Sequence, residues 1–356
     1  MEVTTKKMIP HSRPWITAED RDAVSEILGS GQIAQGDRVA HFEEAFCRRF
    51  GYAGGVAAAS GTTALVLTLR ACGTGGGEVL LPSYVCVNVY QAVQWAGFRP
   101  VLYDVDWNRG PSLPSIRARL SAHTRAIIVV HLFGIPADVQ DVCRLGIPVI
   151  EDCCQAVGLP LGNRFAGSYG DYGMVSFHAT KLMTTGEGGM AFSATAAGFE
   201  RLREAKYGRP GDPVPGWSFP MTDLQAGLGL SQLGRYDDFL DRRSAIARRY
   251  MEALADWPET IPSAFLGRSL FFRFPLRIAA LDYDTVKDDY SRHGIQVRRG
   301  VDAVLHHRTG EPDGAFPNTM RTFRETLSIP LYPALADEEV EHIANITKEV
   351  LRRYVP

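Results

Sequence analysis

The chain has 356 residues, of which 45% are hydrophobic and 22% charged, and its formal net charge is -2 at pH 7. This length allows one large domain with a smaller second one and excludes a short peptide-binding module. Lysines and arginines are spread along the chain, which argues against a nucleic-acid partner, because such a protein carries a basic stripe.

The termini and the cysteines indicate a cytoplasmic protein without a membrane partner. The first residues lack the apolar core of a secretion signal, and no apolar stretch reaches the roughly 18 residues that span a bilayer. The cysteines form no CxxC pair and have no companion histidine spacing, so we expect reduced, packed thiols and no metal. They are Cys47, Cys72, Cys86, Cys143, Cys153 and Cys154.

The first half of the chain alternates short apolar runs with amphipathic segments. The runs are rich in β-branched residues and end at Pro, Asp, Gly or Cys, which is typical of strands buried on both faces. They cover residues 78–82, 99–106, 125–134 and 147–154, and helical stretches lie at 88–96 and 137–145. This βαβ pattern predicts a mainly parallel sheet with helices on both sides. Two further strands are expected at 172–179 and 188–194, around a tight turn.

Near residue 222 the alternation of short apolar runs and amphipathic segments gives way to apolar residues at helical spacing. Helical spacing predicts one or two long helices over 221–257, and a strand, a helix and a closing helix follow at 269–278, 282–294 and 337–355. We therefore predict a large α/β domain over 1–240, N-terminal arm included, and a small α+β domain over 241–356.

The stretch "AAASGTTALVLTLRA" (57–71) predicts a helix that begins near Gly61. Amides of Thr62 and Thr63 would then point out of a helix N-terminus, where the dipole and unsatisfied donors favour a phosphate. An ordinary capped helix is the alternative, because Ser60 is a good N-cap without any ligand.

Asp152 follows the apolar residues of the run "VIEDCCQAVG" (149–158), at the carboxyl end of a predicted strand. A buried carboxylate needs a partner, and a protonated pyridine nitrogen is one that would keep a ring acting as an electron sink. Capping of the next segment is the alternative.

Lys181 lies in "SFHATKLMTTGEGGM" (176–190), a few residues after another predicted strand. A desolvated lysine near a cation is a usable nucleophile towards an aldehyde, although a lone loop lysine is usually solvated. Ser176 adds a hydroxyl, and "TTGEGG" gives a backbone that can approach a ligand closely. By contrast, "GTGGGE" (73–78) precedes a strand, so we interpret it as a connecting loop and not a dinucleotide site.

Phosphate anchor, buried aspartate and lysine, in this order, suit a pyridoxal 5'-phosphate (PLP) enzyme. The chain resembles the DegT-type aminotransferases nearly end to end, most specifically in "VIEDCCQAVG" with "SFHATKLMTTGEGGM" and also in "SGTTAL" and "MTDLQAGLGLSQL". The resemblance implies fold type I, with a seven-stranded mainly parallel sheet, and a homodimer with shared active sites. It implies transfer of an amino group from glutamate to a keto group of a nucleotide-linked sugar.

Residue roles follow from the same resemblance. Lys181 would form the internal aldimine and move the proton, Asp152 would pair with the pyridinium nitrogen, and Gln155 would approach the ring oxygen. The remaining cofactor-binding residues would be Gly61, Thr62, Thr63, Cys86, Ser176, His178 and Ser218, and the substrate-binding residues Tyr84, Asn88 and His306.

Two positions depart from the family pattern. Ser218 in "GWSFPM" stands where an asparagine usually reaches the partner subunit's phosphate, and Cys86 stands where an aromatic residue usually stacks on the ring. A PLP-dependent sugar dehydratase is one alternative, but such relatives carry histidine at the position of Lys181. A non-catalytic regulatory protein of the same fold is the other.

Overall fold

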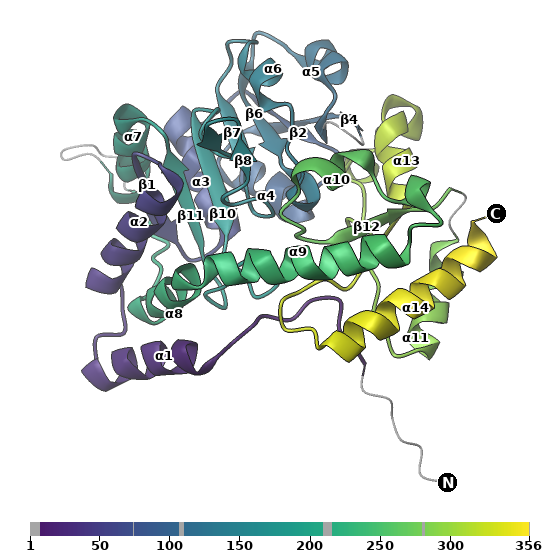
Figure 1. The fold of residues 1–356 in the computed structure, drawn as a ribbon. Helices are drawn as coiled ribbons and strands as arrows, with labels where there is room; N and C mark the ends of the chain where they lie inside the picture. Colours follow the sequence, from purple (N-terminus) through teal and green to yellow (C-terminus); the bar gives the residue numbers. More distant parts are fainter. Residues whose placement is uncertain (1–7, 74, 107–109, 209–215, 280–281, 356) are drawn as a thin grey trace.

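The computed structural model describes residues 8–73, 75–106, 110–208, 216–279 and 282–355. Its centre is a seven-stranded sheet with the strand order β1-β11-β10-β7-β6-β2-β3 (Figure 1). Its strands are β1 (Gly54–Ala58), β2 (Glu78–Pro82), β3 (Arg99–Tyr103), β6 (Thr124–Val130), β7 (Val149–Asp152), β10 (Tyr172–Ser176) and β11 (Gly189–Ser193).

The sheet is mainly parallel. Strands β3, β2, β6, β7 and β10 pair in parallel, and only β11, among the strands of this sheet, runs antiparallel to its neighbours β10 and β1. The prediction of a mainly parallel seven-stranded sheet is confirmed.

Helices cover both faces of the sheet. Consecutive residues of a strand point to opposite faces, and both faces carry apolar side chains that the helices bury. Leu80 belongs to the core under α2, α5 and α6, whereas Val79 and Leu81 belong to the core under α3, α4 and α7. These helices are α2 (Asp37–Phe50), α5 (Leu113–Arg119), α6 (Val139–Cys143), α3 (Gly61–Cys72), α4 (Val87–Trp95) and α7 (Ala196–Tyr207). Helix α1 (Ala18–Ser30) packs on α8 (Asp223–Gly234).

A third hydrophobic cluster lies in the C-terminal part, around the antiparallel pair β12 (Phe274–Arg277) and β13 (Thr326–Ile329). The long helix α9 (Tyr236–Ala253) extends from below the sheet to this part and runs beside α14 (Asp337–Tyr354), as Figure 1 shows. The predicted boundary after residue 240 falls inside α9, and the division into two domains stays a prediction. The other helices here are α10 (Ser263–Arg268), α11 (Tyr283–Arg292), α12 (His306–Thr309) and α13 (Pro317–Glu325).

Several predicted strands were too long, and the runs 147–154, 172–179 and 269–278 form strands only over β7, β10 and β12. β6 ends at Val130, and a 3-10 turn, η1 (Leu132–Gly134), follows because Phe133 has a φ of 58°. The run 99–106 is divided into β3 and β4 (Val105–Asp106). The smaller elements are β5 (Gly110–Pro111), β8 (Pro160–Leu161), β9 (Arg164–Phe165), η2 (Pro258–Thr260) and η3 (Asp313–Ala315). Among the helices in the described ranges, none has the length and apolar character needed to cross a lipid bilayer.

Candidate active site

A cleft of about 560 Å³ opens at the carboxyl edge of the sheet, where β7 and β10 end and α3 begins. Ligands of open α/β sheets bind at this edge. Nine of the residues proposed from the sequence line it, namely Gly61, Thr62, Cys86, Asn88, Asp152, Gln155, Ser176, His178 and Lys181.

The first turn of α3 and the end of β10 form an anion cradle, which we define as Gly61, Thr62 and Ser176. The Ser60 hydroxyl accepts the Thr63 amide at 3.1 Å, and the Ser60 carbonyl accepts the Ala64 amide at 3.0 Å. The amides of Gly61 and Thr62 are therefore the donors of this turn that a ligand could use. A Cβ on Gly61 would lie 2.6 Å from Ser176 Cβ, so only glycine lets helix and hydroxyl come this close.

Asp152 and Gln155 lie on the β7 side of the cleft. Asp152 is 5% exposed, and its Oδ1 accepts the Cys154 amide at 2.9 Å, which leaves Oδ2 as the oxygen for a further donor. Gln155 Oε1 accepts the amide of Phe133 at 2.7 Å. Because the carbonyl end of Gln155 is used in this way, its NH2 end is the one that could donate to a cofactor oxygen.

Glu151, the neighbour of Asp152 on β7, supports the site from the opposite face of the sheet. It is fully buried and accepts His131 Nε2 at 2.9 Å and the amides of Gly167, Tyr169 and Gly170 at 2.7 to 2.8 Å. Burial raises its pKa, but these hydrogen bonds, that from His131 first, more than offset this and hold the pKa below the ordinary value. The carboxylate is therefore ionised and ties β7 to the loop before β10.

Lys181 lies on the connection between β10 and β11. Its amide donates to the His178 carbonyl at 2.9 Å, and its Nζ lies 5.5 Å from the centre of the Phe272 ring. The two ends of this connection are held together, because Ser176 at the end of β10 pairs with Gly189 at the start of β11. Cys86, at the N-cap of α4, faces the same cleft. Desolvation, with the Asp152 carboxylate second, raises the pKa of this thiol, so it is protonated at neutral pH.

Three arginines of the C-terminal part complete the cleft: Arg273, Arg298 and Arg308. Arg273 Nη1 donates to the Arg299 and Gly300 carbonyls at 3.2 and 3.1 Å, and burial lowers its pKa. Arg298 and Arg308 are exposed to the cleft. Sequence reasoning missed all three, and the only available signal was the pair "RR" at 298–299.

Four proposed site residues lie outside the lining of the cleft. Thr63 caps α3 through its hydroxyl and Ser60. Ser218 is exposed on the segment before α8, one residue from Phe219, whose carbonyl accepts the Ala59 amide at 2.9 Å. His306 is fully buried and bonds Ser83.

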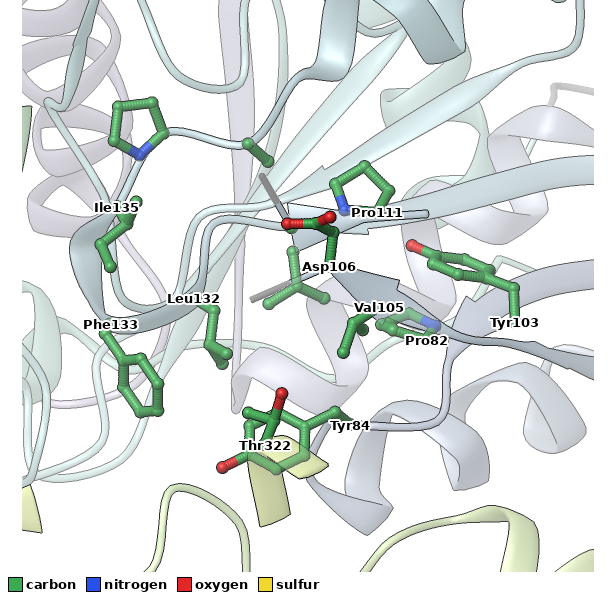
Figure 2. Close-up of a pocket in the computed structure, with 14 residues that line it drawn as sticks. Pro82, Tyr84, Tyr103, Val105, Asp106, Pro111, Leu132, Phe133, Ile135 and Thr322 are labelled. Carbon is green, nitrogen blue, oxygen red and sulfur yellow. The ribbon is translucent and has the colours of Figure 1, made fainter. Parts of the chain in front are cut away.

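Tyr84, the fourth, is 1% exposed and lines a separate small apolar cavity of about 30 Å³, room for one water. Figure 2 shows Tyr84, Leu132 and Thr322 beside this cavity. Val130 and Leu132 line both cavities and separate them. The substrate-binding roles of Tyr84 and His306 stay predictions, although neither side chain reaches the cleft in this chain.

Comparison with known proteins matches this architecture to one family. The model of the DegT/DnrJ/EryC1/StrS aminotransferase family covers residues 14–348. The spore coat polysaccharide biosynthesis protein SpsC of Bacillus subtilis (strain 168) is 31% identical over an alignment 381 positions long, which covers 97% of this chain and 97% of SpsC. Among solved structures, Spr1654 from Streptococcus pneumoniae in its PLP form is 25% identical over 98% of this chain and 100% of its own, with a TM-score of 0.90. DesI, solved in the presence of its TDP-sugar product, is 26% identical over 98% of this chain and 94% of its own, with a TM-score of 0.90.

Proposed function

Because the chain belongs to the PLP-dependent DegT/DnrJ/EryC1/StrS family of sugar aminotransferases, we propose that it moves an amino group from glutamate to a keto group of a nucleotide-linked sugar. The observation that carries this proposal is the gathering of Lys181, Asp152 and the anion cradle around one cleft that arginines of the C-terminal part also line.

The residues of the cleft fit PLP. A phosphate would take the free amides of the anion cradle and the Ser176 hydroxyl, at the positive end of the α3 dipole. Asp152, with Oδ2 available in a nearly buried site, would hold a proton on the ring nitrogen. Gln155 would donate its NH2 group to the ring oxygen, and Cys86 would lie against the ring as a small polarizable group.

When bound, PLP supplies an aldehyde that carries the amino group and a ring that takes up the electron pair of the substrate carbon. The chain does the rest. Lys181 Nζ would move the proton between the substrate carbon and the cofactor carbon that carries the amino group, and positioned proton transfer of this kind contributes about 10² to 10⁴ in rate. His178 holds the start of the lysine loop, since its carbonyl accepts the Lys181 amide.

The arginines support an anionic acceptor. Arg298 and Arg308 are exposed and line the same cleft as the anion cradle, so a diphosphate beside these two arginines would be bound by charge-assisted hydrogen bonds. DesI, with its TDP-sugar product, is a precedent for such a ligand on this fold. Asn88, at the rim and 3.4 Å from Thr62 Oγ1, would contact the sugar.

We also propose a homodimer with shared active sites. Exposed apolar side chains lie on α1, three residues after it, at the end of α7 and beside Ser218: Leu28, Ile33, Tyr207 and Phe219. Gln35 Nε2 donates to the Tyr207 hydroxyl at 3.3 Å, and the Ala59–Phe219 bond places the last of them beside the start of α3. A second copy would cover this surface next to the anion cradle. Light scattering should then give about twice the chain mass of 39.1 kDa.

The activity is tested in half-reactions. Purified protein should carry a visible cofactor band that borohydride reduces, and glutamate should bleach this band with release of one 2-oxoglutarate per site. Lys181→Ala should abolish the exchange, whereas Lys287→Ala, which removes an exposed lysine of α11, should leave it unchanged. A band that glutamate never bleaches would refute the donor, and activity retained in Lys181→Ala would refute the role of the lysine.

The acceptor is tested with keto sugars added to the aminated enzyme, each as the nucleotide-linked and the free sugar. Arg298→Ala with Arg308→Ala should raise KM for the linked sugar by about 10-fold or more, since a hydrogen bond to a charged group contributes about 1.5 to 3 kcal/mol. An equal effect on the free sugar would contradict recognition of the nucleotide.

A further inference from the structure

A cluster of two histidines and one carboxylate lies beside the cleft but outside its lining. We define the His-His-Asp cluster as His306 and His307 of α12 and Asp313 of η3. His306 Nε2 lies 3.2 Å and His307 Nε2 2.7 Å from the same oxygen, Asp313 Oδ1. One atom from each residue lies within 4.8 Å of the other two.

The ring of His306 is held in this position by its surroundings. Ser83 Oγ lies 2.7 Å from Nδ1 and also accepts the His306 amide at 3.1 Å, and the imidazole stacks on Phe316 with a centroid distance of 4.4 Å and an interplanar angle of 9°. A partner on Nδ1 that leaves Nε2 for a ligand is the arrangement that supports metal-binding histidines. The fully buried His306 is therefore oriented before any ion arrives.

The carboxylate is also oriented. Arg324 Nη2 donates to Asp313 Oδ2 at 3.1 Å, so Oδ1 is the oxygen that faces the imidazoles.

We propose that the His-His-Asp cluster binds a divalent transition-metal ion such as Zn²⁺ or Co²⁺, with a solvent molecule in the fourth position. Two imidazole nitrogens and one carboxylate oxygen are a donor set that these ions accept, and three protein ligands with an open position are common. In a tetrahedral site with bonds of about 2.0 Å, ligand atoms are about 3.3 Å apart. The His306–Asp313 separation of 3.2 Å already has this size, and the His307–Asp313 separation of 2.7 Å needs to widen by about 0.6 Å. The ion would replace the protons that now lie between these atoms.

The place of the cluster explains what an ion would stabilise. Ser83 follows β2, and its carbonyl accepts the Leu305 amide at 3.0 Å, so His306 connects the end of a sheet strand to α12. Asp313 lies beyond the end of α12, on η3. An ion would therefore fasten α12 and η3 together at the rim that carries Arg308.

The test uses tag-free, cofactor-loaded protein and Co²⁺. We expect one Co²⁺ per chain, with the d–d absorption of a four-coordinate N/O site in difference spectra and no thiolate charge-transfer band. His307→Ala and Asp313→Asn, at two exposed ligands, should each weaken Co²⁺ binding at least 10-fold, and Zn²⁺ should displace the ion.

His123→Ala is the matched control, because His123 is exposed and far from the cluster in sequence. It should bind Co²⁺ like the wild type. Circular dichroism of each variant separates loss of a ligand from loss of the fold. Absence of stoichiometric binding by the wild type, or affinity unchanged in both His307→Ala and Asp313→Asn, would overturn the proposal.

Discussion

Replacing Gly61 by alanine should weaken cofactor binding, because the added methyl group would collide with Ser176 inside the anion cradle. The added Cβ would lie 2.6 Å from Ser176 Cβ and 3.1 Å from both Cα and Oγ of that residue, and contacts below 3.0 Å require a shift. Ser176 cannot easily retreat, because β10 pairs it with Gly189 and its hydroxyl accepts the His178 amide at 3.3 Å. The start of α3 must move instead, and its two free amides move with it.

The free energy of cofactor binding should become less favourable by roughly 1.5 to 3 kcal/mol, which is the contribution of one hydrogen bond to a charged group. This corresponds to cofactor binding that is about 10- to 150-fold weaker. Helix propensity alone predicts the opposite sign for stability, since alanine in a helix is favoured over glycine by about 1 kcal/mol. The two effects are therefore separable in one variant.

The assay is titration of the apoprotein with PLP, followed by absorbance. Gly267→Ala in α10 is the control, because its Cβ would meet nothing within 4 Å and it lies outside the proposed dimer surface, and it should bind PLP like the wild type. In the double variant Gly61→Ala/Ser176→Gly the closest contact disappears, so the loss in affinity should be smaller than the sum of the two single losses. Wild-type affinity in Gly61→Ala, or strict additivity in the double variant, would refute the steric argument.

Four further predictions concern residues in and beneath the cleft. Glu151→Gln should lower the free energy of unfolding by about 3 kcal/mol in denaturant titrations, because buried amide donors lose an ionised acceptor; no loss would contradict this. The pKa of Glu151 is lower in the folded than in the unfolded state, so its ionised carboxylate stabilises the fold at pH values above the ordinary pKa of 4.5. This stabilisation is lost as the pH falls from 4.5 through the folded pKa. On acidification the free energy of unfolding should therefore fall more steeply for the wild type than for Glu151→Gln. Gln155→Leu should lower the free energy of unfolding by about 1 kcal/mol, because it removes the hydrogen bond that the Phe133 amide donates to Gln155 Oε1, and an unchanged melting temperature would be inconsistent with a contribution from that bond. Because the pKa of Cys86 is raised, iodoacetamide should alkylate it at pH 8 more slowly than glutathione, as measured by peptide mass spectrometry; an equal or faster rate would disprove the shift.

The sheet and one side of the cleft were predictable because they depend on local pattern. Apolar runs that end at polar residues identify buried parallel strands, and the carboxyl ends of such strands meet at one edge. For this reason the gathering of Asp152, Ser176 and Lys181 along one cleft follows from the sequence.

The part of the cleft that the C-terminal residues line was not predictable, because tertiary packing brings those residues there. Arg273, Arg298 and Arg308 belong to the C-terminal part and carry no motif, so only the folded chain brings them to the cleft. His306 illustrates the same limit, since its position in the sequence suggested substrate contact while packing turns its ring towards Ser83 and Phe316. The end of β6 was placed too late because nothing local marks the left-handed Phe133.

The pairing of β1 with β11 has a consequence for the order of assembly. Gly54 lies opposite Ser193, so this pair joins the most distant segments of the central sheet and closes its longest loop. Loop-closure entropy makes such contacts late in folding. The anion cradle joins the helix after β1 to the strand beside β11, so it exists only once this last pair has closed. The amount of cofactor bound during refolding should therefore measure the number of fully folded molecules. Because the cofactor binds only the native state, it should also shift the equilibrium from late folding intermediates towards that state.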